Sequence, residues 1–235
     1  LHGGLVMRYI KHLLLGIIAL SLMGIGPFFA PVDTKAKARS SFMLNCFQDG
    51  QLIGAGSANH FTYRGQKFIL TAYHVIEECD TVTLIEENSE VFELKTVVYD
   101  KMLDWAVMKA KKDLVLRPVK FKRTYPSLGE GIDMVSWPSD YGLVYTKGIV
   151  SGQQFLSYYV QTFCWLGSSG ASVFTDDGKF IGVLHGIKVG FYSSVGDAQL
   201  LNNMCLVRPL ASITDKELYE ALRDYDGGEA RHITY

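Results

Sequence analysis

Beyond residue 40 the sequence repeats one pattern, a short apolar run followed by turn residues, about once every ten positions. The runs are rich in β-branched and aromatic residues, which favour strands. Short strands at this even spacing are typical of an all-β domain, and two sets of six fit two six-stranded antiparallel β-barrels. The first expected set is Ser41–Phe47, Gly54–His60, Lys67–Thr71, Thr81–Glu86, Val91–Asp100 and Trp105–Ala110. The second is Gly131–Trp137, Leu143–Ser151, Tyr158–Gln161, Ala171–Phe174, Phe180–Ile187 and Asn203–Val207.

The strand pattern is interrupted between residues 113 and 128, where Pro118 and Pro126 fall. We therefore expect the two barrels to be joined there. The expected regions are an N-terminal segment at 1–39, the first barrel at 40–120, the second barrel at 121–213, and a C-terminal helix with its tail at 214–235.

An amphipathic helix is expected at Asp215–Tyr225. Thr214 precedes it as a cap, and Glu217 follows three residues later as the partner in a capping box. Leu218 and Leu222 are four residues apart and form one apolar stripe, which we expect to pack on the second barrel.

The N-terminal segment contains a stretch without charge, residues 13–30, which follows Arg8 and Lys11. Such a stretch is either a secretory signal peptide or a membrane anchor. Ala36-Lys37-Ala38 has the small-x-small pattern of a cleavage site, but it lies far from the apolar stretch. The sequence therefore predicts an exported protein, periplasmic or secreted, or one held at a membrane through residues 13–30, and leaves these alternatives open.

The overall charge and the cysteines exclude some classes of partner and cofactor. The formal net charge is −1, and no run of lysine and arginine marks a nucleic-acid groove. The four cysteines, at positions 46, 79, 164 and 205, allow three disulfide connectivities, or they are small buried apolar side chains. They show no Cys-x-x-Cys motif and no histidine at ligand spacing, so we expect no zinc and no cofactor.

Three polar residues stand at the ends of apolar runs, in the order histidine, aspartate, serine. His74 follows the run that ends at Leu70, Asp104 precedes another run, and Ser169 lies in Gly167-Ser168-Ser169-Gly170. This is the chain order of one class of catalytic triad. The residues are 30 and 65 positions apart, so only tertiary folding can bring them together.

The chemistry of acyl transfer needs these residue types. A serine hydroxyl is a weak nucleophile unless a base accepts its proton, and an imidazole with a pKa near ~6.5 suits that task. Asp104 would fix the tautomer of His74 and stabilise the imidazolium. The amides of Gly167 and Ser169 would hold the oxyanion. Ser168 is the rival nucleophile, but only Ser169 has a glycine two residues before it and another directly after it.

These motifs resemble the trypsin-like (chymotrypsin-fold) serine peptidases, most closely the HtrA/Deg branch, over about residues 41 to 210. The resemblance implies His74 as general base, Asp104 as triad acid and Ser169 as nucleophile. Only about 25 residues follow Pro209, so we expect no PDZ domain after the barrels. The similar stretches are Thr71-Ala72-Tyr73-His74-Val75, Asp104-Trp105-Ala106-Val107, Lys147-Gly148-Ile149-Val150-Ser151-Gly152, Gly167-Ser168-Ser169-Gly170-Ala171 and Gly178-Lys179-Phe180-Ile181-Gly182-Val183.

The resemblance places the specificity pocket at Phe163, Cys164, His185 and Gly186. Phe163 favours an apolar or small side chain before the scissile bond. The stretch contains no aspartate to pair with a basic side chain, so we do not expect cleavage after lysine or arginine. Relatives that cleave after Glu or Gln often carry a histidine in the same strand, one position earlier relative to Gly182. Because strand side chains alternate, the offset would turn His185 toward Asp104 instead of the substrate.

The sequence therefore predicts a serine endopeptidase that acts on protein or peptide substrates through an acyl-enzyme, and it gives no indication of the oligomeric state. Ser168, Ala171 and Ser172 depart from the family pattern at the oxyanion loop. A catalytically inactive binding module on the same fold is therefore one alternative. A viral or phage processing protease is another.

Overall fold

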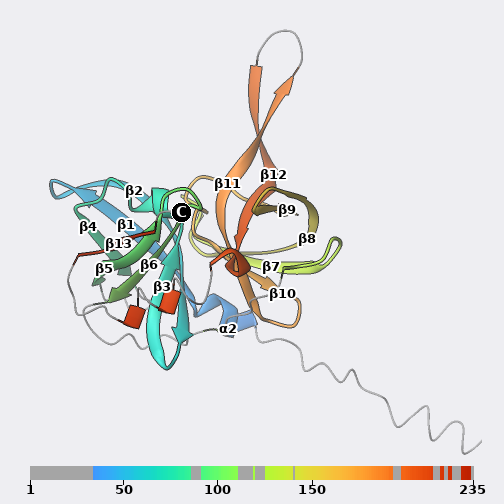
Figure 1. The fold of residues 1–235 in the computed structure, drawn as a ribbon. Helices are drawn as coiled ribbons and strands as arrows, with labels where there is room; N and C mark the ends of the chain where they lie inside the picture. The colour runs from blue at the N-terminus through green and yellow to red at the C-terminus, as the bar shows by residue number, and fades with distance from the viewer. Residues whose placement is uncertain are drawn as a thin grey trace, which may run out of the picture. The chain divides into compact units, whose positions relative to one another are not determined.

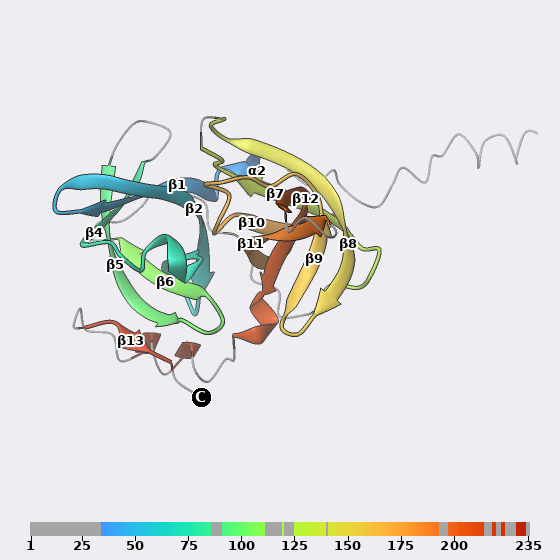
Figure 2. The same cartoon turned by 90° about the horizontal axis from the view of Figure 1, so that it is seen from above.

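The computed structural model describes residues 34–85, 91–110, 119, 125–139, 141–192, 197–213, 218–219, 222–223 and 229–233. Within these residues the fold is all-β, with two closed six-stranded antiparallel barrels and little helix, as the strand pattern predicts (Figure 1). Figure 2 shows the barrels side by side, seen from above.

The first barrel closes in the strand order β5-β4-β1-β2-β3-β6, with β6 pairing back to β5. A short strand near the C-terminus, β13, adds to β5 in parallel. The short helix α2 (Thr34–Ala38) precedes this barrel, and the 3₁₀ turn η1 (Tyr73–Val75) follows β3. The strands are β1 (Ser41–Gln48), β2 (Gln51–Tyr63), β3 (Gln66–Thr71), β4 (Thr81–Ile85), β5 (Val91–Asp100), β6 (Trp105–Ala110) and β13 (Arg231–His232).

The second barrel closes in the order β10-β11-β12-β9-β8-β7, with β7 pairing back to β10. A 3₁₀ turn, η3 (Leu210–Ser212), follows its last strand. The strands are β7 (Gly131–Ser136), β8 (Val144–Gln154), β9 (Ser157–Gln161), β10 (Ser172–Thr175), β11 (Phe180–Tyr192) and β12 (Asp197–Pro209).

The largest difference from the expected strands is the length of the hairpin formed by β11 and β12. The sequence predicts that the first strand ends at Ile187 and that the second begins at Asn203. In the structure their pairing continues beyond these residues, from Lys188↔Leu201 to Tyr192↔Asp197. This ribbon projects from the second barrel in Figure 1. A two-stranded ribbon buries neither face completely, so its sequence lacks the apolar run that marks a barrel strand.

Three regions with specific predictions fall wholly or partly outside the described residues. They are the apolar stretch at 13–30, most of the connection at 113–128, and most of the helix expected at Asp215–Tyr225. Four residues of that helix, 218–219 and 222–223, have helical backbone, and Leu218 and Leu222 are buried. No helix among the described residues is both long and apolar enough to cross a membrane.

The strands that line the joint between the barrels bury both faces, because each barrel has its own interior and a third apolar cluster lies between the barrels. On β6, Ala106 and Met108 face the interior of the first barrel, while Trp105 and Val107 join the shared cluster. On β10, Val173 belongs to the second interior and Phe174 to the shared cluster. The continuous apolar runs of the sequence follow from this two-sided burial.

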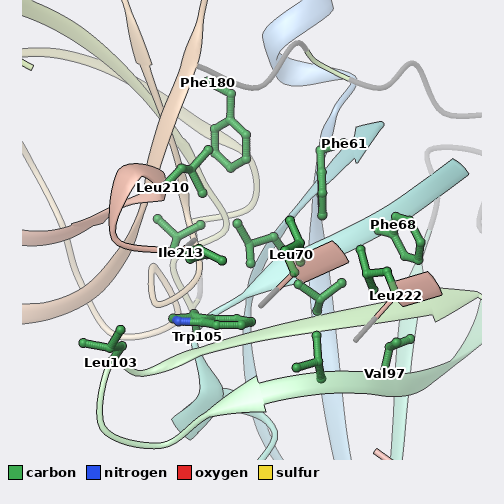
Figure 3. Close-up of a cluster of buried hydrophobic side chains, with 14 of the residues drawn as sticks. Phe61, Phe68, Leu70, Val97, Leu103, Trp105, Phe180, Leu210, Ile213 and Leu222 are labelled. Atoms are coloured by element: carbon green, nitrogen blue, oxygen red, sulfur yellow. The ribbon is translucent and has the colours of Figure 1, made fainter. Parts of the chain in front are cut away.

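The shared cluster joins the two barrels. Figure 3 shows Trp105 and Leu70 from the first barrel near Leu210 and Ile213, which follow the last strand of the second barrel. Trp105 is completely buried, so the residue beside it, Asp104, is fixed at the edge of this cluster.

Each barrel also contains one disulfide, which decides between the alternatives that the sequence left open for the cysteines. Cys46 pairs with Cys79, and Cys164 pairs with Cys205. The first connects β1 to the segment that follows η1, and the second connects the segment before Gly167 to β12. In the sequence, Cys79 of the first disulfide therefore lies near His74, and Cys164 of the second lies near Ser169.

We expect removal of the Cys164–Cys205 disulfide to destabilise the protein. The two cysteines are 41 residues apart. Closing a loop of this size lowers the conformational entropy of the unfolded chain, which raises its free energy by about 4 kcal/mol. The double substitution Cys164→Ala and Cys205→Ala should therefore lower the free energy of unfolding by about 2–4 kcal/mol. Denaturant unfolding measures this change; because reductant opens both disulfides, the wild type in reductant should lose at least as much stability as this variant. An unchanged unfolding midpoint in both would contradict the disulfide.

Candidate active site

His74 lies in the 3₁₀ turn directly after β3. The preceding residue, Tyr73, is buried and stacks on Tyr99 with ring centroids 4.7 Å apart, which fixes the turn on the first barrel. The side chain of His74 is 44% exposed, so one edge of its ring is accessible from solvent.

Asp104 holds His74 through two hydrogen bonds. The backbone N–H of His74 donates to Oδ1 of Asp104 at 2.9 Å, and its Nδ1 lies 2.8 Å from Oδ2. A carboxylate can only accept, so Nδ1 carries the hydrogen and Nε2 keeps its lone pair. The backbone of Asp104 has a φ of 54°, which aspartate tolerates better than most residues. Its neighbour Trp105 is anchored between the barrels, and this combination aims the carboxylate at His74.

The two side chains shift each other's pKa in opposite directions. The hydrogen bond to Asp104 raises the pKa of His74 above 6.5, against the opposing effect of partial burial. Burial works to raise the pKa of Asp104, but the hydrogen bonds from His74 outweigh it and hold that pKa below its ordinary value. Asp104 is therefore ionised at neutral pH, and its carboxylate makes the neutral imidazole of His74 a stronger base.

The loop that contains Ser169 depends on two glycines. Gly167 and Gly170 have φ values of 85° and 84°, in the left-handed region that disfavours side chains. A Cβ at Gly170 would also overlap the carbonyl oxygen of Ser57, and one at Gly167 would meet the backbone of Ser139. The loop can therefore keep this shape only with glycine at both positions.

The two serines of this loop have different surroundings. Ser168 is completely buried, and its Oγ accepts a hydrogen bond of 3.1 Å from the backbone N–H of Trp165. Ser169 is partly exposed. A nucleophile must reach a substrate, so the surroundings favour Ser169 over Ser168.

The amides of the loop also differ. Those of Ser168, Gly170 and Ala171 donate to backbone carbonyls, whereas within the described residues those of Gly167 and Ser169 have no hydrogen-bond acceptor. The carbonyl of Leu166 accepts from the N–H of Ser139 at 2.9 Å. In a trans peptide the N–H points opposite to the carbonyl, so the Gly167 N–H points away from Ser139. Two amide donors are thus left for an anion beside Ser169.

Ser57, on β2 of the first barrel, connects this loop to the rest of the site. Its backbone N–H donates to the carbonyl of Ser169 at 2.7 Å, and its carbonyl accepts from the Thr71 hydroxyl at 2.8 Å. Its own hydroxyl donates to the Gly167 carbonyl at 2.9 Å and accepts from the N–H of Trp137 at 2.8 Å. Ser57 is completely buried, so all four groups depend on it. No sequence motif marks this residue, although it follows Gly54 and Gly56 inside an expected strand.

His185 lies beside Asp104, the arrangement that the one-residue offset in the sequence favours over a pocket role. Its Nδ1 is 3.8 Å from Oδ2 of Asp104, too long for a hydrogen bond, and its Nε2 is 2.9 Å from the Ser157 hydroxyl. The pairing of β11 with β12 shifts register between Leu184 and Gly186, so His185 occupies a β-bulge, which redirects its side chain. Burial, together with the charge of Arg208, lowers the pKa of His185 to about 4.

The other residues expected in the pocket lie on both sides of the loop. Phe163 is partly exposed, and the ring of Tyr141 meets it edge-on with centroids 6.1 Å apart. The Cys164 side chain is buried in its disulfide and turned away from solvent. Gly186 is partly exposed and follows the bulge. Among the described residues, no group of three His, Cys, Asp or Glu side chains is arranged to hold a metal ion.

Known proteins are similar to this chain in sequence and in fold. The family model of the trypsin-like peptidase domain matches residues 56–183. The chain is 28% identical over 127 residues to the serine endoprotease DegS of Salmonella typhimurium, covering 49% of this chain and 35% of DegS. It is 24% identical over 167 residues to DegS of Haemophilus influenzae, covering 66% and 48%. The chain thus spans less than half the length of these relatives.

A solved structure shows the same fold. The serine endoprotease from Yersinia pestis superimposes with a TM-score of 0.66 at 19% sequence identity, covering 83% of this chain and 68% of that one.

The two histidines near Asp104 should titrate far apart. In a pH titration followed by NMR, we expect the imidazole of His74 to titrate above pH 6.5 and that of His185 near pH 4. Asp104→Asn removes the charge that stabilises the imidazolium, so it should lower the pKa of His74. A wild-type His74 that titrates below 6.5, or a pKa unaffected by Asp104→Asn, would contradict the pairing.

Proposed function

The chain belongs to the trypsin-like peptidase family, which comprises serine endopeptidases, and we propose that it hydrolyses peptide bonds in protein or peptide substrates with a Ser169-His74-Asp104 triad. The observation that carries this proposal is the double hydrogen bond from His74 to Asp104, which leaves Nε2 of His74 as a free base. The partly exposed Ser169, in a loop shaped by two glycines, supports it further.

In the proposed reaction, Oγ of Ser169 attacks the carbonyl carbon of the scissile bond while Nε2 of His74 takes the hydroxyl proton. The Gly167 and Ser169 amides stabilise the oxyanion of the tetrahedral intermediate, and Asp104 stabilises the imidazolium. When the C–N bond breaks, His74 gives its proton to the leaving amine. Water then attacks the acyl-enzyme with His74 again as base, which releases the acid and regenerates Ser169.

We propose that Phe163 forms the apolar floor of the pocket before the scissile bond, with Tyr141 beside it. This favours substrates with an apolar or small side chain there. The Cys164–Cys205 disulfide would brace the floor, and Gly186 would leave room for the substrate backbone. His185 would act on Asp104 instead of on the substrate.

An exported or membrane-tethered location is part of the proposal. Two disulfides join all four cysteines, and disulfides persist in oxidising compartments rather than in the cytosol. The uncharged stretch at 13–30 supports the same conclusion.

Replacement of Ser169 tests the function most simply. We expect Ser169→Ala to abolish labelling by a fluorophosphonate probe and to reduce kcat by at least about 10⁴-fold, because the nucleophile is lost. Ser168→Ala is the matched control, since it should keep the labelled hydroxyl. Labelling that persists in Ser169→Ala would contradict the assignment, and a folded wild type without labelling or peptide turnover would favour an inactive binding module.

Ser57→Ala should lower kcat more than it changes KM. Without the hydroxyl, the partly buried Gly167 carbonyl and Trp137 amide lose their partner, and the oxyanion loop loses one of its hydrogen bonds to the first barrel, keeping the one from the Ser57 N–H to the Ser169 carbonyl. We expect kcat to fall by about 10- to 100-fold, the usual effect of small misplacement at a reacting centre. Steady-state kinetics with a peptide substrate measure this, and Ser151→Ala, at an exposed serine, provides the control. An unchanged kcat would show that Ser57 has no positioning role.

A further inference from the structure

The segment before the first barrel packs a lysine against the outer face of the second barrel. Lys37 lies on α2, and only 2% of its surface is exposed, whereas its neighbour Lys35 is exposed. Figure 2 shows α2 beside β7 and β10. Lysine is almost never buried so completely without a charged partner, so this position has a specific cause.

The partners of Lys37 lie on two strands of the second barrel. Its Nζ donates to Oδ2 of Asp133 on β7, and to the carbonyl of Thr175 on β10 at 3.3 Å. It also lies 5.6 Å from the ring centroid of Phe174, on the same strand. Asp133 is itself 2% exposed, and its second oxygen is 3.0 Å from Nζ of Lys147. The ion pair is thus buried on both sides.

The residues that follow Lys37 bind the opposite end of β10. The Ser40 hydroxyl donates to the Lys37 carbonyl at 2.8 Å. The Ser41 hydroxyl lies 2.7 Å from that of Ser172, which also accepts from the Asn59 side chain at 2.6 Å. Ser172 and Thr175 are the first and last residues of β10. Residues 34–41 therefore hold both ends of the strand that begins three residues after Ser169.

We propose that residues 34–41 form a strap in which Lys37 is a positioning residue for β10 and thereby for Ser169. This inference rests on the proposed peptidase function. Because Lys37 is buried against the second barrel, the active chain retains it. Ala36-Lys37-Ala38 is then no processing site of the active protein, although its sequence has the pattern of one, because cleavage after Ala38 would remove Lys37 from Asp133.

Substitution of Lys37 in the full chain tests the positioning role. Lys37→Met keeps most of the length of the side chain and removes its charge. We expect about a tenfold lower kcat and a similarly lower rate of fluorophosphonate labelling, with KM within about twofold, because the strap holds the nucleophile and not the substrate. Lys35→Met, on the same helix, is the matched control and should behave as the wild type. A folded Lys37→Met protein with the kcat of the wild type would overturn the proposal.

Thermal unfolding separates this inference from the proposed function. Lys37→Met should melt about 5–10 °C below the wild type, since it leaves Asp133 short of one partner, and Lys35→Met should not. This result does not depend on catalysis, so an unlabelled wild type would overturn the function and leave the strap standing. If Lys37→Met does not fold, Lys37→Arg keeps the charge and should recover folding with a reduced labelling rate; wild-type kcat in that variant would overturn the positioning role.

The N-terminus of the mature protein provides an independent test. After export of the full chain, mass spectrometry of the protein labelled by the fluorophosphonate should find a first residue upstream of Lys37. A labelled, active chain that begins at Arg39 would overturn the proposal.

Discussion

The joint between the two barrels fixes the candidate site. His74 and Asp104 belong to the first barrel and Ser169 to the second, so the geometry of the three depends on how the barrels meet. An apolar cluster around Trp105 fills the joint, and Ser57 crosses it with hydrogen bonds to Gly167, Ser169 and Trp137. Apolar packing is not directional, whereas hydrogen bonds are. The hydrogen bonds of Ser57 therefore fix the position of the Ser169 loop relative to the first barrel, which the apolar cluster alone would not fix.

Much of this arrangement was predictable from the sequence. The twelve barrel strands follow from short apolar runs, which bury both faces where a strand lines the joint, and β5 and β6 begin and end where the pattern predicts. The resemblance to trypsin-like peptidases of the HtrA/Deg branch is confirmed by the family match and the two DegS relatives. Motifs of this kind are visible because a strand end or a glycine turn constrains several neighbouring residues at once.

Other features depend on contacts between distant residues and were not predictable. Lys37 has the appearance of an ordinary solvent-exposed lysine until Asp133, 96 residues away, is folded against it. Nothing in the sequence distinguishes Ser57 from other strand serines, and its role is visible only from its hydrogen bond to Gly167 in the folded protein. Strand alternation suggested the direction of His185, but the cause is a β-bulge that only the pairing of β11 with β12 reveals. The cysteine pairing likewise needed the fold to choose among three connectivities.

The most direct measurement is a crystal structure of the protein after reaction with a peptidyl phosphonate. We expect phosphorus bonded to Oγ of Ser169, a phosphonyl oxygen within about 2.7–3.1 Å of the Gly167 and Ser169 amide nitrogens, and Nε2 of His74 within hydrogen-bond reach of the adduct. An adduct on another residue, or a His74 ring too far from Oγ of Ser169 to exchange a proton, would contradict this expectation.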